Sequence, residues 1–293
     1  MEINKGDFGN VLKKMMSLSD NVASSAVYLS AGVFPAEAQR DIEVLGLLGQ
    51  LAVCTDSLQN ICTIMKHNLA FYTEGFHGWS ALTRRVCIKY GLPDPLSYMQ
   101  YPWRPDRWRQ HCKQIVGKHW EQILKETARQ KDSLEYFDID SSSLFKPTQN
   151  WVLAGLDSLQ VKMATIVNWM QLGVYKTREK LHQFKLIKED ICISCNLNQK
   201  ENLYHLIFVC PFYDNIRQPS HSRIFLMNPN IVEVVENARL KMIVILDPQS
   251  KLLPDMVRES WKQDASDVFK TTRHMLYNIH KKREKFYAEK DKT

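Results

Sequence analysis

Long hydrophobic runs are absent from this 293-residue sequence. The longest, at 206–210 and 242–246, fall far short of the roughly 20 residues that a bilayer crossing requires, so we expect no membrane partner. The first residues, MEINKGDFGN, lack a basic start followed by an apolar stretch, so no secretory signal is visible. We therefore expect an intracellular protein, nuclear or cytoplasmic, in a reducing compartment.

Glycine and proline are also scarce, at 11 residues each, and no segment is low in complexity, so long flexible linkers are excluded. Hydrophobic residues make up 44% of the chain, which is ample for a packed core. The formal charge of +7 favours a polyanionic partner only mildly. In a reducing compartment the seven cysteines are expected to be thiols or metal ligands rather than disulfides.

Apolar residues recur at helical spacing along most of the chain. Pro35 suits a first helical position, and it precedes a helix whose apolar face holds Ile42, Leu45, Leu48 and Leu51. Residues 58–69 and 79–90 repeat the pattern. Pro105 opens a long helix with one apolar stripe, made of Trp108, Cys112, Ile115, His119 and Ile123. These patterns predict a mostly α fold, with helical bundle regions flanking a small metal-binding module.

Four regions are expected along the chain. Residues 1–25 suggest a leader or a frayed helix, and residues 26–150 form a helical region. Residues 151–217 combine a helix with the metal-binding module. Residues 218–293 form C-terminal helices with a basic tail, the helices being expected over 231–246 and 256–286.

The metal-binding module is predicted from the spacing C-x2-C, nine residues, H-x4-C, which Cys192, Cys195, His205 and Cys210 provide. Two residues between thiolates let the chain bend so that both sulfur atoms face one ion, and zinc takes four tetrahedral ligands of these kinds. Because protein side chains fill all four positions, we expect one structural zinc ion (Zn2+) rather than a catalytic one.

A helix is expected within the module. Asn198 and Glu201 resemble a capping box, which predicts a helix over 199–209 that presents His205 near its middle and ends before Pro211.

Alternatives to this site remain open. The C-x2-C pair alone suits a redox dithiol, although no βαβ pattern surrounds it, and buried free cysteines beside a surface histidine would need no metal. A second site would need Cys87, His111, Cys112 and His119, whose spacing fits no ligand pattern and is more typical of core positions.

Two clusters of basic residues are candidate contacts for RNA or single-stranded nucleic acid. The first lies beside Trp103 and Trp108, where an indole could stack on a base, although Trp108 is better explained as a core residue. It consists of Arg104, Arg107, Arg109 and Lys113. The second lies in the tail and consists of Lys281, Lys282, Arg283 and Lys285. The alternative is that both clusters are solvated surface.

The string CNLNQKENLYHLIFVCPFYDNIR resembles the zinc segment that follows the reverse transcriptase domain in non-LTR (LINE-type) retrotransposon polyproteins. Cys210, Pro211, Tyr213 and Arg217 match its pattern. Strings at 35–52, 89–103, 173–177, 238–257 and 272–287 are similar to the same C-terminal region, so that the resemblance covers roughly residues 26–288.

This resemblance implies a segment that helps to hold template RNA and target DNA during target-primed reverse transcription. We expect no enzyme activity, since the polymerase palm lies outside such a segment. The only echo of its aspartate hairpin, at 136–140, has non-adjacent aspartates and is better explained as a loop. The expected function is thus a non-catalytic, zinc-stabilised nucleic-acid-binding accessory segment. The alternative is a structural or protein-interaction module, from a domesticated or decayed transposon fragment.

Overall fold

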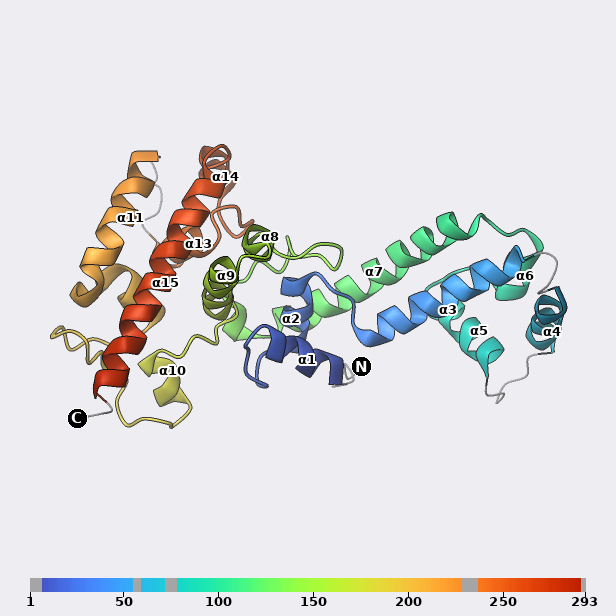
Figure 1. Ribbon diagram of the computed structural model, residues 1–293, viewed down its shortest axis with the longest axis horizontal. Coiled ribbons are helices and arrows are strands. Elements are labelled where there is room, and N and C mark those ends of the chain that lie inside the picture. The colour runs from blue at the N-terminus through green and yellow to red at the C-terminus, as the bar shows by residue number, and fades with distance from the viewer. Residues whose placement is uncertain (1–6, 55–58, 72–77, 228–236, 291–293) are drawn as a thin grey trace.

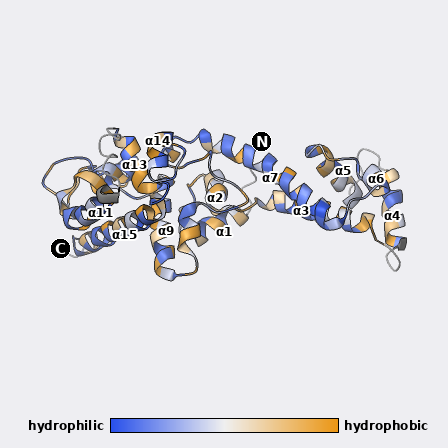
Figure 2. Cartoon of the chain, turned by 90° about the horizontal axis from the view of Figure 1, so that it is seen from above, coloured by the Kyte–Doolittle hydropathy of each residue, from blue (hydrophilic) through white to orange (hydrophobic). Residues whose placement is uncertain are grey.

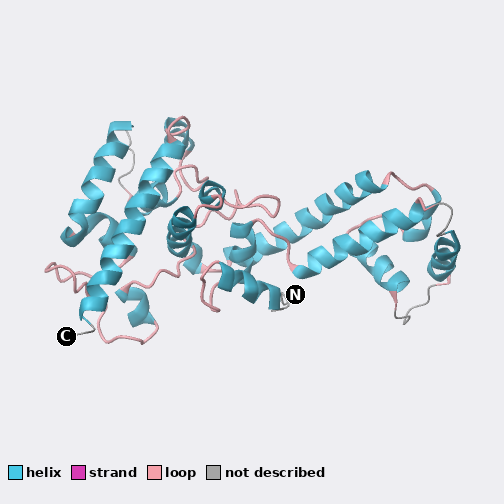
Figure 3. Cartoon of the chain, viewed as in Figure 1, coloured by secondary structure: helices cyan, strands magenta, loops and turns pink. Residues whose placement is uncertain are grey.

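The computed structural model describes residues 7–54, 59–71, 78–227 and 237–290. Within these ranges the regular elements are all helices (Figure 3), which confirms the mostly α fold. The only β-type pairings found there are isolated bridges, between Ser143 and Lys146 and between Ile191 and Lys200. No helix in the described part is both long and apolar enough to cross a membrane.

The N-terminal half forms an arm in which two long helices, α3 and α7, run side by side (Figure 1). Shorter helices pack at its two ends. The helices of this half are α1 (Asp7–Met15), α2 (Ser24–Ala31), α3 (Ala36–Ala52), α4 (Gln59–Ala70), α5 (Trp79–Lys89), α6 (Pro95–Gln100) and α7 (Pro105–Arg129). Viewed from above, α3 and α7 carry many hydrophilic residues (Figure 2), as expected of helices that pack through one face only.

Local sequence explains the packing of α3 against α7. Pro35 precedes α3 and Pro105 begins α7, where the missing N–H group of proline costs nothing. The indole of Trp108 is buried and donates a hydrogen bond of 2.8 Å to the carbonyl of Leu45. A Cβ atom on Gly49 would lie 2.3 Å from Cδ1 of Trp108, so the two helices approach closely at this glycine. The prediction that Trp108 is a core residue is confirmed.

The C-terminal half is built around the long helix α15, which packs against α9, α11 and α13. Its helices are α8 (Gln149–Ala154), α9 (Ser158–Gln171), α10 (Arg178–Gln183), α11 (Asp214–Met227), α13 (Ala238–Leu246), α14 (Asp255–Ser260) and α15 (Ala265–Lys290). The helix expected over 231–246 is described only from residue 237 onward. Trp261 and the five residues 242–246 are buried in the core of this half.

Two hydrophobic cores divide the chain. The first runs from Leu12 to Leu144 and includes Leu172, and the second runs from Ile166 to Ile279. Regions 151–217 and 218–293 both contribute to the second core, so they form one packed unit. Residues 1–25 were expected to be a leader or a frayed helix. The described part, 7–25, instead packs into the first core, where apolar side chains such as Leu12 and Val22 are buried.

Candidate metal centre

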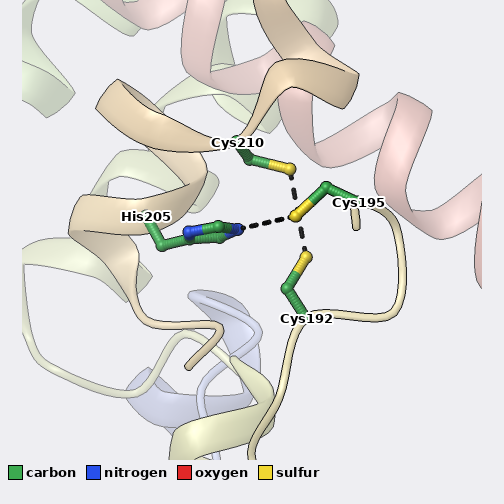
Figure 4. Close-up of side chains that lie close together, drawn as sticks. All are labelled: Cys192, Cys195, His205 and Cys210. Atoms are coloured by element: carbon green, nitrogen blue, oxygen red, sulfur yellow. Dashed lines mark hydrogen bonds between the residues drawn. The ribbon is translucent and has the colours of Figure 1, made fainter. Parts of the chain in front are cut away.

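The structure brings the four predicted metal ligands together (Figure 4). Sγ of Cys192 lies 3.9 Å from Sγ of Cys210, and Sγ of Cys195 lies 3.4 Å from Nε2 of His205. One ligand atom from each residue lies within 4.8 Å of all the others. The group can therefore hold one metal ion.

A tight loop, residues 191–200, presents the first two cysteines. Its ends are joined by the bridge between Ile191 and Lys200 and by a hydrogen bond of 2.8 Å from the Cys192 N–H to the Gln199 carbonyl. Asn198 adopts a left-handed conformation with φ of 52°, which asparagine tolerates better than most residues. We call this segment the cysteine loop.

The helix that carries His205 begins later than predicted. Its cap is Asn202, whose side-chain oxygen accepts a hydrogen bond of 2.8 Å from the His205 N–H, and a π-helical turn follows over His205–Val209. The predicted capping box is wrong, because Asn198 belongs to the turn of the cysteine loop. Cys210 follows the helix directly, as expected, and its N–H donates to the His205 carbonyl over 2.7 Å.

The imidazole of His205 is oriented for ligation. The side chain is buried, and its Nδ1 lies 3.3 Å from Oε1 of Gln199. An Nδ1–H donated to this amide oxygen fixes the tautomer in which Nε2, the atom facing Cys195, carries a free lone pair. Gln199 is thus a positioning residue for the candidate ligand.

The thiols of the group influence one another. A hydrogen bond from Cys210 lowers the pKa of Cys192, and the same contact raises the pKa of Cys210. Burial raises the pKa of Cys195. Three thiolates this close together would repel one another, so ionising all three cysteines needs a cation among them.

A buried ion pair ties this module to the rest of the C-terminal half. The Glu201 side chain is fully buried, and its Oε1 accepts hydrogen bonds of 2.6 and 3.1 Å from the Arg283 guanidinium on α15. Its Oε2 accepts one of 2.8 Å from the Tyr287 hydroxyl. The backbone N–H of Arg178, at the start of α10, donates to Oε1 over 3.1 Å. Glu201 therefore joins the metal-binding module to two helices.

This pairing corrects two predictions. Glu201 was assigned to the capping box, and Arg283 to the basic tail that contacts phosphates. The Arg283 side chain is only 6% exposed, because the Glu201 carboxylate holds it inside the protein. A separation of 82 residues leaves no local pattern from which the pair could have been found.

The other predicted basic residues differ in their surroundings. Within the tail, Lys281 and Lys285 are exposed, whereas Nζ of Lys282 donates to the Phe212 carbonyl over 2.6 Å and to Oδ1 of Asn215 over 2.8 Å. The four residues near the start of α7 are all exposed. Among these, Arg104 pairs with Asp106 at 3.1 Å, and Arg109 pairs with Glu43 at 2.9 Å.

The alternative metal site does not form. In the described ranges, the Cys-Cys-His-Cys group is the only set of three or more potential ligands that converge. Cys87 and Cys112 are buried in the first core, and burial raises the pKa of each to about 12. The segment 136–140 is a loop in which the Asp138 carboxylate accepts hydrogen bonds from the N–H groups of Ser141 and Lys251.

Comparison of the chain with protein-family models, curated proteins and solved structures gives no match.

Proposed function

We propose that this protein is a non-catalytic, zinc-stabilised segment that binds RNA or single-stranded nucleic acid, of the kind that follows the reverse transcriptase domain in LINE-type polyproteins. The observation that carries the proposal is the exposed basic and aromatic surface where α7 begins. We call it the α7 surface, and it consists of Tyr101, Trp103, Arg104, Arg107 and Lys113.

Zinc is the metal that fits the site best. Zn–S bonds of about 2.3 Å and Zn–N bonds of about 2.0 Å place tetrahedral ligand atoms about 3.5 to 3.8 Å apart. The contacts of 3.9 Å between Cys192 and Cys210 and of 3.4 Å between Cys195 and His205 agree with these values. Thiolates favour zinc over hard cations such as Mg²⁺. With four protein ligands the ion would fasten the cysteine loop to the helix that follows, and would leave no position for a substrate.

The α7 surface has the chemistry of a nucleic-acid contact. Tyr101 is 83% exposed and Trp103 is 43% exposed, so the first ring and part of the second are open to a base. The Arg107 guanidinium lies 5.4 Å from the centre of the Trp103 ring. Within the described part of the chain, neither Arg107 nor Lys113 has an acidic partner. Such cations pair with phosphates while aromatic rings stack on unpaired bases.

The proposed family is supported by where the residues that match its pattern lie in the structure. Tyr213 and Arg217 are buried just after the candidate ligand Cys210, so this part of the matching string serves the packing of the module. A metal-binding module in the C-terminal half and an exposed basic surface at the start of α7 together form the combination that the resemblance implies.

A second candidate function is a protein-interaction module without nucleic-acid binding. Exposed apolar side chains on α8, α9 and the turn between them favour it, namely Val152, Leu156 and Leu159.

Titration with fluorescent RNA and single-stranded DNA oligonucleotides, at about 50 and 200 mM salt, tests the proposed function. We expect micromolar or tighter binding at the lower salt and a steep loss at the higher one. The Arg104→Ala/Arg107→Ala variant should bind more weakly than the control Lys131→Ala/Lys162→Ala, which removes two exposed lysines elsewhere. Absence of wild-type binding at low salt would contradict the proposal and favour the interaction module.

A further inference from the structure

Helix α10 is unusual in this fold because none of its residues is buried. It lies at the edge of the C-terminal half, close to the start of the cysteine loop (Figure 1). A six-residue helix is marginal by itself. Here the Thr177 side chain caps it by accepting from the Lys180 N–H over 3.2 Å, and Glu201 accepts from the Arg178 N–H. The protein thus holds in place a helix that is only partly buried.

The helix and its flanking residues, 176–188, carry a concentrated positive charge. We call this stretch the α10 segment. It has five cationic side chains and one acidic one, a net +4, against +7 for the whole chain. The Arg178 guanidinium bonds to the Glu189 carbonyl. In the part of the chain that the structure describes, no acidic partner is found for the remaining four cations, Lys176, Lys180, Lys185 and Lys188.

The aromatic ring of Phe184 lies between these lysines in the sequence. Phe184 is 65% exposed and Leu186 is 69% exposed, and both follow α10 directly. Lys185, between them, adopts a left-handed conformation with φ of 58°, which makes a turn. Exposing a phenyl ring and a leucine at one turn leaves apolar surface in water that a partner could cover.

We propose that the α10 segment is a second contact for single-stranded nucleic acid. The inference rests on the proposed function and places a contact beside the metal-binding module. Lysines 176, 180, 185 and 188 pair with phosphates, and Phe184 stacks on an unpaired base. The segment takes the role that the sequence suggested for the tail. In the tail, Arg283 is paired with the Glu201 carboxylate, and Lys282 donates a hydrogen bond to the Phe212 carbonyl.

The chemistry of the segment favours an unpaired strand over a duplex. A single exposed ring can stack on a base only if the face of that base is free, whereas a duplex offers this surface its phosphates alone. An anionic membrane would also attract lysines beside apolar residues, so lipid vesicles belong in the test.

Two variants separate the contribution of base stacking to binding from that of the phosphate contacts. Phe184→Ala should weaken binding to a single-stranded oligonucleotide by about tenfold, near the low end for one stacked base, and should leave duplex binding unchanged. Lys185→Ala/Lys188→Ala should reduce the slope of log affinity against log salt by about 1.4, since each phosphate contact to a single strand contributes about 0.7. The control Lys131→Ala/Lys162→Ala should change neither quantity.

The outcomes distinguish this inference from the proposed function. If the wild type binds no oligonucleotide, the proposed function fails and the inference with it. If the wild type binds and both α10 variants bind as tightly as the control, only the inference is overturned. The inference is also overturned if Phe184→Ala weakens binding to phosphatidylserine vesicles but leaves binding to the oligonucleotide unchanged.

A measurement on the wild type covers the case in which a variant misfolds. Photo-cross-linking to an RNA that contains 4-thiouridine, followed by peptide mapping, should label residues 176–188. Labelling confined to the α7 surface would overturn the inference.

Discussion

Replacing Arg283 by methionine removes the guanidinium that compensates the buried Glu201 carboxylate. Methionine keeps much of the volume of arginine but offers no hydrogen-bond donor. Two of the hydrogen bonds to Oε1 are lost, and the carboxylate keeps only the Tyr287 hydroxyl and the Arg178 N–H.

The expected loss of stability is large because both partners are buried. The Glu201 side chain is 0% exposed and that of Arg283 is 6% exposed, so solvent screens the pair little. Leaving one member of such a pair uncompensated costs about 3 to 5 kcal/mol. The Glu201→Gln/Arg283→Met variant carries no uncompensated charge, so it should recover a large part of that loss.

Urea unfolding of the metal-loaded protein measures this effect. The control is Lys285→Met, a neighbouring cation whose side chain is 77% exposed, and it should change the free energy of unfolding by less than about 0.5 kcal/mol. Suppose instead that Arg283→Met left stability unchanged and weakened RNA binding. The guanidinium would then contact phosphate, as the sequence first suggested, and the structural role of the pair would be refuted.

Three further predictions concern the metal, a half-buried carboxylate and the close helix contact. Wild-type protein purified without chelator should contain one equivalent of zinc by mass spectrometry, and Cys195→Ser/His205→Ala should contain none; retention by the variant would refute the site. Burial raises the pKa of Asp247 to about 7, so the folded state holds a proton that the unfolded state releases near pH 4. The contribution of Asp247 to stability should therefore fall as the pH rises from 4 to 7, and Asp247→Asn should unfold at higher urea than wild type at pH 7 but not at pH 4. Gly49→Ala should lower the free energy of unfolding by about 1 to 3 kcal/mol, because the new Cβ would lie 2.3 Å from the Trp108 ring; a stabilised variant would contradict this packing.

Sequence predicted the features that depend on local spacing. The apolar face of α3 and the proline that begins α7 are periodic or positional signals that the structure follows, whereas Pro35 lies one residue before α3. The metal ligands lie within one short stretch, so their spacing alone was enough to group them.

Features that depend on distant contacts could not be predicted in this way. Glu201 and Arg283 meet only because the segment that follows the cysteine loop packs on α15, and neither residue differs in type from its exposed neighbours. The wrong prediction of the residue that caps the helix carrying His205 has a similar cause. Asn198 and Asn202 both suit the start of a helix, and the closure of the cysteine loop decides between them.

The length of α7 sets a minimum size for any ligand that touches both ends of the molecule. Its 25 residues span about 37 Å at 1.5 Å per residue. That distance equals about 11 steps of a fully stacked strand, at the 3.4 Å per step of duplex DNA. Stacked oligomers well below this size can occupy one end only, whereas longer ones gain from simultaneous attachment at both. Affinity plotted against oligomer length should accordingly rise in a step rather than smoothly.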